Sequence, residues 1–185
     1  VIATLALAVG LGVTAVVLAG GYLLVGKRER EQVMATPSED PNRLTQEGWR
    51  LWQAQQLQEA ATNFTRAVLL APDNPNAWNG LGWASFNSGQ MEEAEKAFQK
   101  AITLNPNLPG ALNGLGQIYL SQRKYELAES HLLKAAPQAP AAWHGLARLY
   151  LIQGRFEDAE EWAQKVVDSG QADDVARQML KAAQA

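Results

Sequence analysis

The tetrapeptide Asn-Gly-Leu-Gly occurs twice in this chain, and its two copies start 34 positions apart, at residues 79 and 113. Proline pairs separated by two residues recur on a similar interval, at Pro72/Pro75, Pro106/Pro109 and Pro137/Pro140. Proline breaks helices and is tolerated in their first turn, so each pair marks a boundary between helical segments. A recurring interval of this length indicates a chain built from stacked structural units.

Each repeat contains two sets of residues with helical spacing. In the first half of the repeat, small and apolar residues recur at i, i+3, i+4 and i+7, for example Trp78, Leu81, Gly82 and Ser85. The second half carries a set of its own, for example Ala94, Phe98 and Ala101. Turn residues at 87–89 separate the two halves. Each unit is therefore predicted to be a pair of short helices.

These columns resemble the tetratricopeptide repeat family. The resemblance rests on the Trp-x-x-Leu-Gly opening, the Ala-x-x-x-Phe pair and the closing proline, which are Trp78, Leu81, Gly82, Ala94, Phe98 and Pro106. The chain departs from the pattern at Ser85, Leu132 and Ala163, and its third unit is three residues shorter. These departures concern local packing, and the resemblance covers about residues 41–170.

The predicted fold is all-α. It is an α-solenoid of about four tetratricopeptide helix pairs, at 41–74, 75–108, 109–139 and 140–170, preceded by a single transmembrane helix at 1–26 and a basic linker at 27–40. A helix at 171–185 is expected to cap the open end of the stack, as solenoids require. Its apolar face is predicted to contain Val175, Ala176, Met179, Leu180 and Ala183.

Residues 1–26 contain no charged side chain. The run exceeds the roughly 20 residues that a helix needs to cross a bilayer. The alternative is a secretory signal peptide cut before Gly20, but the apolar run continues past that point and exceeds a typical h-region of about 7–15 residues. A single-pass anchor in the cell (inner) membrane is favoured, with the lipid bilayer as a partner of this segment.

Three cations, Lys27, Arg28 and Arg30, follow the apolar run. By the positive-inside rule they favour a cytoplasmic location for the repeats, with a periplasmic or other exported location as the alternative. Within the run, small residues recur on one helical stripe, where a second transmembrane helix could pack: Ala8, Gly12, Ala15 and Ala19.

A second face of each first helix is expected to bind a ligand, because the resemblance implies that these helices line a concave, peptide-binding groove. The candidate residues are Asn42, Gln46, Trp49, Trp52, Asn76, Asn79, Gly80, Trp83, Phe86, Asn87, Asn113, Gly114, Gln117, Leu120, His144 and Arg148. Their aromatic rings offer rigid apolar contact area, and their amides can bond a peptide backbone. The alternative is that some of these rings pack between helices, as is expected for Trp78 and Trp143.

Glycine inside a helix costs about 1 kcal/mol relative to alanine. Gly48, Gly82 and Gly116 are expected on the face toward the partner helix, where space is short. Gly80, Gly114 and Gly145 fall on the second face. They either open the floor of the groove to a ligand backbone or relieve crowding between neighbouring first helices.

The remaining composition limits the function. The net charge of −3 argues against nucleic acid as the main partner. The chain has no cysteine, and its two histidines, His131 and His144, have no carboxylate or histidine at metal or triad spacing. No glycine-rich phosphate loop follows a strand pattern. The sequence thus predicts neither an enzyme nor a cofactor.

The predicted function is a membrane-anchored scaffold whose groove binds a peptide or protein client, for the assembly or organisation of a membrane complex. The client is expected to carry apolar or aromatic residues, with at most one acidic group near Arg148. The alternative is a tethered accessory or regulatory segment of a larger membrane enzyme or sensor, for which the missing initiator methionine is the direct sign.

Overall fold

The computed structural model describes residues 40–170 and 174–184, which belong to one compact unit. The predicted transmembrane segment at 1–26 and residues 27–39 of the linker lie outside the described residues. Within the described ranges, no helix is long and apolar enough to cross a membrane.

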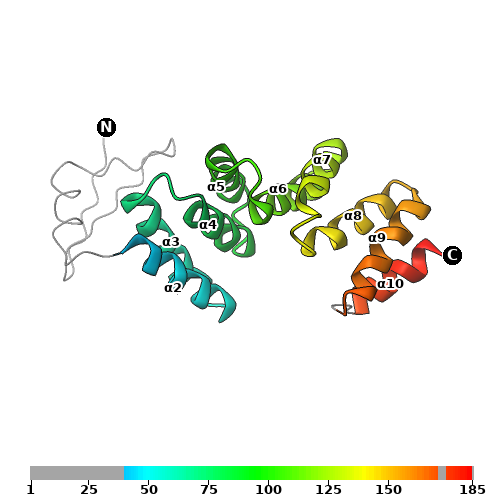
Figure 1. The fold of residues 1–185 in the computed structure, drawn as a ribbon, viewed down its shortest axis with the longest axis horizontal. Coiled ribbons are helices and arrows are strands. Elements are labelled where there is room, and N and C mark those ends of the chain that lie inside the picture. Colours follow the sequence, from blue (N-terminus) through cyan, green and yellow to red (C-terminus); the bar gives the residue numbers. More distant parts are fainter. Residues whose placement is uncertain (1–39, 171–173, 185) are drawn as a thin grey trace, which may run out of the picture. The chain divides into compact units, whose positions relative to one another are not determined.

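The described chain consists of helices joined by short turns (Figure 1). Four consecutive pairs are followed by a last helix: α2 (Pro41–Gln53) and α3 (Leu57–Leu70), α4 (Pro75–Asn87) and α5 (Met91–Leu104), α6 (Pro109–Ser121) and α7 (Tyr125–Ala135), α8 (Ala141–Ile152) and α9 (Phe156–Asp168), then α10 (Asp174–Ala183). Each helix packs against its neighbour in sequence, and α2, α4, α6 and α8 also pack one against the next. The predicted all-α solenoid is confirmed.

Local sequence explains where the first helices begin. Pro41, Pro75 and Pro109 occupy the first turns of α2, α4 and α6. Asp40 Oδ1 accepts a hydrogen bond from the Asn42 amide at 2.9 Å, and Asn74 Oδ1 does the same for Asn76 at 3.0 Å. Such caps satisfy amide groups that the helix itself leaves unpaired.

One residue in each turn inside a helix pair has a positive φ. Gly89 and Gly154 have φ values of 78° and 72°, whereas Gln55 and Arg123 reach 62° and 59° at the equivalent positions. Glycine adopts this left-handed conformation without steric cost, and other residues pay for it. The first and third turns are therefore strained relative to the second and fourth.

Three large buried side chains of the core, Phe64, Phe98 and Leu132, each meet two glycines. Phe64 is fully buried between α2 and α4, where a Cβ atom at Gly48 would lie 2.7 Å from the ring and one at Gly80 would collide with it. Gly82 and Gly114 face Phe98 in the same way. The second helix of each unit thus packs against its own first helix and against the next one.

The same arrangement continues in the third unit with a smaller side chain. Leu132 is fully buried and meets both Gly116 and Gly145. In the last helix pair, Ala163 stands at the position of Phe64, Phe98 and Leu132. Ala147 stands at the position of Gly48, Gly82 and Gly116. Both alanines are buried. Where the enclosed side chain becomes small, the glycine is no longer required.

The tryptophans that open the second and fourth units brace the junctions between units. Trp78 Nε1 donates to the Pro72 carbonyl at 2.9 Å, and Trp143 Nε1 donates to the Ala136 carbonyl at 2.8 Å. Both rings pack against the core, as predicted. Although the third unit is three residues shorter than the first, both units therefore have a tryptophan-to-carbonyl hydrogen bond at the junction with the next unit.

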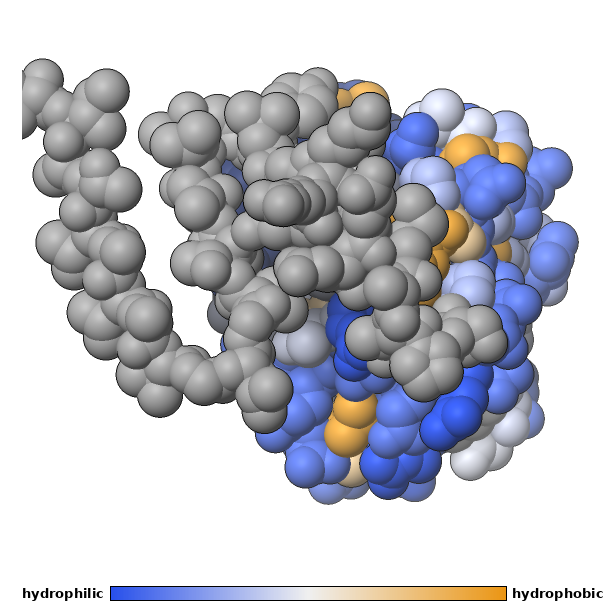
Figure 2. Space-filling view, turned by 90° about the vertical axis from the view of Figure 1, so that its left-hand side faces the viewer, coloured by the Kyte–Doolittle hydropathy of each residue, from blue (hydrophilic) through white to orange (hydrophobic). Residues whose placement is uncertain are grey.

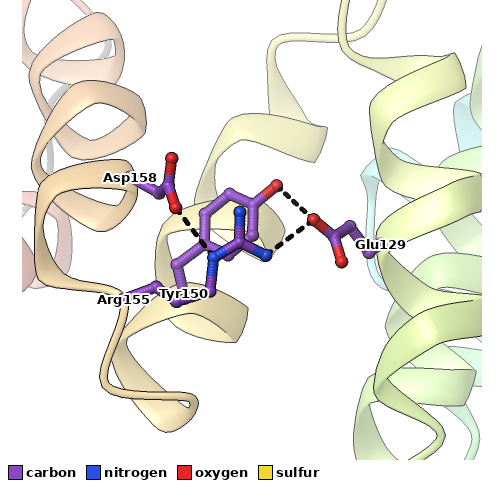
Figure 3. Close-up of polar contacts among 4 residues, drawn as sticks. All are labelled: Glu129, Tyr150, Arg155 and Asp158. Carbon is purple, nitrogen blue, oxygen red and sulfur yellow. Dashed lines mark hydrogen bonds and ion pairs between the residues drawn. The ribbon is translucent and has the colours of Figure 1, made fainter.

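A polar cluster joins α7, α8 and α9 (Figure 3). The Tyr150 hydroxyl donates to Glu129 Oε1 at 2.8 Å, and Arg155 bonds both Glu129 (2.9 Å) and Asp158 (2.7 Å). The Arg155 guanidinium lies 4.1 Å from the centre of the Tyr150 ring. Burial and the hydrogen bond to Glu129 raise the pKa of Tyr150 to about 12. This cluster holds the last helix pair against the one before it.

The final helix packs against α9 and α8. Ala176 and Ala183 are buried, and Gln184 Nε2 donates to Glu160 of α9 at 2.8 Å. Val175, predicted on the inner face, is 56% exposed. That prediction is wrong because the buried stripe of α10 is narrower than the apolar pattern of its sequence.

Candidate functional site

The predicted binding residues lie at three depths on the first helices. The exposed ones are Asn42, Gln46, Asn76, Asn87 and Arg148. The half-buried ones are Trp49, Trp52, Trp83, Phe86, Gln117 and His144. The buried ones are Asn79, Gly80, Asn113, Gly114 and Leu120. Only the first two groups present side-chain surface in this conformation.

The glycines on this face are packing residues. Gly80 and Gly114 face the Phe64 and Phe98 rings, and Gly145 faces Leu132 and the Gln117 amide. The interpretation that they open a groove floor is therefore wrong. The crowding interpretation holds in a modified form. Gly80 and Gly114 are crowded by the second helix of the preceding unit, and Gly145 is crowded by both helices of the preceding unit. Leu120 is likewise a packing residue, at 4% exposure.

Four rings on α2 and α4 form a continuous row, which we call the aromatic cluster: Trp49, Trp52, Trp83 and Phe86. Successive ring centroids lie 5.6, 6.4 and 5.6 Å apart, each pair edge to face. These separations are typical of attractive aromatic pairs. The cluster bridges the first two units and remains half-buried, so its outer surface can meet a ligand.

Two core phenylalanines pack against the aromatic cluster. The Phe64 ring lies 5.2 Å from Trp49, and the Phe98 ring lies 5.3 Å from Trp83, both edge to face. The two Phe rings are fully buried. The tryptophans therefore both pack on the core and present an outer surface, which combines the two roles that the sequence left as alternatives.

The aromatic cluster ends at α6. Gln117 takes the position that Trp83 has in the preceding unit, and the buried Leu120 takes the position of Phe86. The change from Trp83 to Gln117 thus marks the boundary between an aromatic surface and a polar one.

Two equivalent asparagines beneath this face differ in their hydrogen bonding. Asn79 and Asn113 are 8% and 4% exposed. Gln117 Nε2 donates to Asn113 Oδ1 at 3.3 Å, one turn along the same helix. Asn79 Oδ1 is buried without a hydrogen-bond partner, and so is Trp52 Nε1. The sequence predicted both asparagines as ligand contacts, and their burial was missed because it depends on the adjacent unit.

The part of the described surface that is visible at the N-terminal end is mostly hydrophilic. Figure 2 shows the end of the protein that carries α2 and α3, where hydrophilic residues form most of the described surface in view and hydrophobic ones appear at separate places between them.

In the described part of the chain, no group of three or more His, Cys, Asp or Glu side chains is placed so that it could hold a metal ion. The His131 ring packs 5.3 Å from Tyr119, and its Nδ1 lies 2.8 Å from the Leu127 carbonyl oxygen. These contacts give His131 a structural role.

The fold and this face define the class of protein, a helical-repeat protein of tetratricopeptide type with an aromatic row on its first helices. Residues 51–176 match the family described as "Cilia and flagella-associated protein 70 middle TPR-like domain", and the chain belongs to that family. The resemblance found in the sequence is thereby confirmed. No curated protein matches the chain.

Solved structures share the fold at low sequence identity. The chain is similar to pilF of Pseudomonas aeruginosa, with 18% identity and a TM-score of 0.65 over 82% of this chain and 70% of that one. It is also similar to a thermophilic TPR protein of Thermus thermophilus, TTC0263 (21%, TM-score 0.65, over 84% and 87%). A third similar structure, YrrB (17%, TM-score 0.60, over 83% and 90%), is described as a TPR protein with an unusual peptide-binding site. These likenesses support the fold.

Proposed function

We propose that this protein is a tetratricopeptide scaffold that binds a protein or peptide segment on the first helices of its units. The observation that carries the proposal is the aromatic cluster, whose four large rings are half-buried and aligned across α2 and α4. Large aromatic side chains dominate binding energy at protein interfaces and are costly to leave in water. The peptide-binding site ascribed to YrrB supports this use of the fold.

The charge of the face favours an uncharged or apolar segment. None of the predicted binding residues on α2, α4 and α6 is charged. Arg148 on α8 is the cationic member of the set and lies two units away from Trp83. A ligand with apolar or aromatic residues on the first two units, and at most one acidic group near Arg148, fits this distribution.

We propose in addition that residues 1–26 anchor the scaffold in the cell membrane. The support is the uncharged run and the three cations that follow it. In this proposal the repeats are cytoplasmic and organise a membrane-associated complex. A reporter fused after Ala185 tests the orientation: activity of a cytoplasm-specific reporter supports it, and activity of an export-specific reporter places the repeats on the other side.

The binding proposal is tested by crosslinking in cells. An aromatic photoreactive residue replaces Trp83, so that a ring remains in the aromatic cluster, and the matched control places the same residue at Lys96 of α5, outside the cluster. We expect a discrete crosslinked protein at position 83 that position 96 does not capture, identified by mass spectrometry. Equal crosslinking from both positions, or none from position 83, would contradict the proposal.

The accessory-segment alternative is tested separately. Sequencing the natural N-terminus of the protein purified from its own cells shows whether an enzyme or sensor domain precedes Val1. Finding such a domain would favour that alternative over a separate scaffold.

A further inference from the structure

The apolar packing between consecutive units decreases along the solenoid. At each junction a core side chain of the second helix meets the first helix of the next unit, and these side chains are, in chain order, Phe64, Phe98 and Leu132. A smaller side chain buries less apolar area. The helix that carries Leu132, α7, has 11 residues, compared with 14 in α3 and in α5. The third junction, between the third and fourth units, therefore has less apolar packing than the two before it.

The polar contacts change in the opposite direction. At the third junction, Glu129 of α7 accepts hydrogen bonds from Tyr150 at 2.8 Å and from Arg155 at 2.9 Å (Figure 3). The equivalent carboxylate at the second junction, Glu95, accepts from Gln122 at the longer distance of 3.4 Å. Short bonds to a charged group are the stronger ones. The third junction thus depends on its polar contacts more than the second does.

The first junction has different residues in these columns. Ala61 stands at the position of Glu129, and Ser85 stands at that of Tyr150. An alanine side chain cannot accept a hydrogen bond. The Phe64 ring, which is fully buried, packs at this junction instead.

Water reaches the polar contacts of the third junction. The side chains of Glu129 and Arg155 are 25% and 43% exposed. Dissolved salt screens ion pairs that are accessible to solvent. When such partners separate, water solvates both of them, so that no buried charge is left unpaired. These contacts can therefore break and re-form without unfolding the helices that carry them.

The opposite end of the junction is a fixed connection. Trp143 Nε1 donates to the Ala136 carbonyl at 2.8 Å, beside the short link from α7 to α8. Glu129 precedes Ala136 by seven residues, and Tyr150 follows Trp143 by seven, which corresponds to about 10 Å along each helix. The link and the bond of Trp143 therefore form a pivot, and the contacts of Glu129 lie about two helical turns from it.

We propose that Glu129, Tyr150 and Arg155 form a latch, and that the fourth unit swings away from the third when this latch opens. The helix α10 moves with the fourth unit, because it packs on α8 and α9 and because Gln184 donates to Glu160 at 2.8 Å. Opening changes the curvature of the solenoid between its third and fourth units, while the first three units stay packed. This inference does not depend on the proposed ligand.

Hydrogen exchange of the full 185-residue chain, followed by mass spectrometry, tests the latch. Glu129→Gln removes the charge at nearly constant size, and the matched control Glu95→Gln removes the equivalent charge one unit earlier. Raising sodium chloride from about 20 mM to about 500 mM should speed exchange in α8, α9 and α10 relative to α4 and α5, because salt screens the latch. Glu129→Gln should speed exchange in α8, α9 and α10 about tenfold at low salt and remove most of the salt effect. Glu95→Gln should leave those helices as in wild type.

A distance measurement supplies a second readout. The chain has no cysteine, so spin labels can be placed at introduced cysteines alone. The pair Ser130→Cys and Glu161→Cys spans the third junction at equivalent exposed positions, and the pair Lys96→Cys and Ser130→Cys spans the second. In the Glu129→Gln background, double electron–electron resonance should show a second, longer distance for the first pair and one distance for the control pair.

Three results would overturn the inference. The first is exchange of α8, α9 and α10 at the rate of α4 and α5 under all conditions. The second is an equal effect of Glu129→Gln and Glu95→Gln on the exchange of α8, α9 and α10. The third is faster exchange in Glu129→Gln with one unchanged distance across the third junction, which would mean that the helices loosen without swinging apart.

Discussion

The substitution Gly80→Ala tests the packing role of the helical glycines. In an exposed helix, alanine would gain about 1 kcal/mol over glycine. Here the new methyl group would collide with the Phe64 ring, which also meets Gly48 and is fully buried. Overpacking of a core typically costs about 1–3 kcal/mol. We expect the free energy of unfolding to fall by about 1 kcal/mol or slightly more once the propensity gain is subtracted.

The assay is urea unfolding followed by circular dichroism, in a double-mutant cycle with Phe64→Leu. In the Phe64→Leu background the collision is relieved, so Gly80→Ala should become neutral or stabilising by up to about 1 kcal/mol. The last pair of the protein shows an equivalent compensation in the neighbouring column, where Ala147 stands at the position of Gly82 and Ala163 at that of Phe98. If Gly80→Ala alone stabilises the protein, the packing argument is refuted.

Three further predictions concern the rest of the solenoid. Arg123→Gly should raise the free energy of unfolding by about 1 kcal/mol, because Arg123 has a positive φ, and Gly89→Ala should lower it by a similar amount; urea midpoints check both. Between about pH 10 and 12 the unfolded chain loses the tyrosine proton while folded Tyr150 retains it, so stability should fall as pH rises, by at most about 1.4 kcal/mol per pH unit. Tyr150→Phe should remove that component of the pH dependence. A variant whose stability depends on pH as that of wild type does would contradict the assignment to Tyr150. Met179→Asp should expose α9 and α10 to hydrogen exchange before the other helices, whereas uniform exchange would argue against a capping role for α10.

The sequence predicted the helix pairs well because their signals are local. Helical spacing, first-turn prolines and the turn residues at 87–89 each act within a few positions. The repeat interval then related one unit to the next. The inward glycines and the packing roles of Trp78 and Trp143 followed from the same columns.

The features that sequence analysis missed depend on contacts between units. Gly80 and Gly114 were placed on the correct helical face, but that face also meets the second helix of the preceding unit. The bond from Tyr150 to Glu129 joins residues 21 positions apart and leaves no periodic signal. One clue was available, because Asn113 and Gln117 are spaced i, i+4 on a helix and can bond each other.

The central claim, that the aromatic cluster binds a protein segment, is tested most directly by one affinity comparison. The segment captured by crosslinking at position 83 is synthesised, and its dissociation constant is measured by calorimetry with wild type, Trp83→Ala and Trp162→Ala. Trp162 is a matched control, since it is a half-buried tryptophan on α9, outside the cluster. The account predicts that Trp83→Ala weakens binding at least tenfold, about 1.4 kcal/mol, while Trp162→Ala leaves it unchanged. Equal effects of the two substitutions would contradict it.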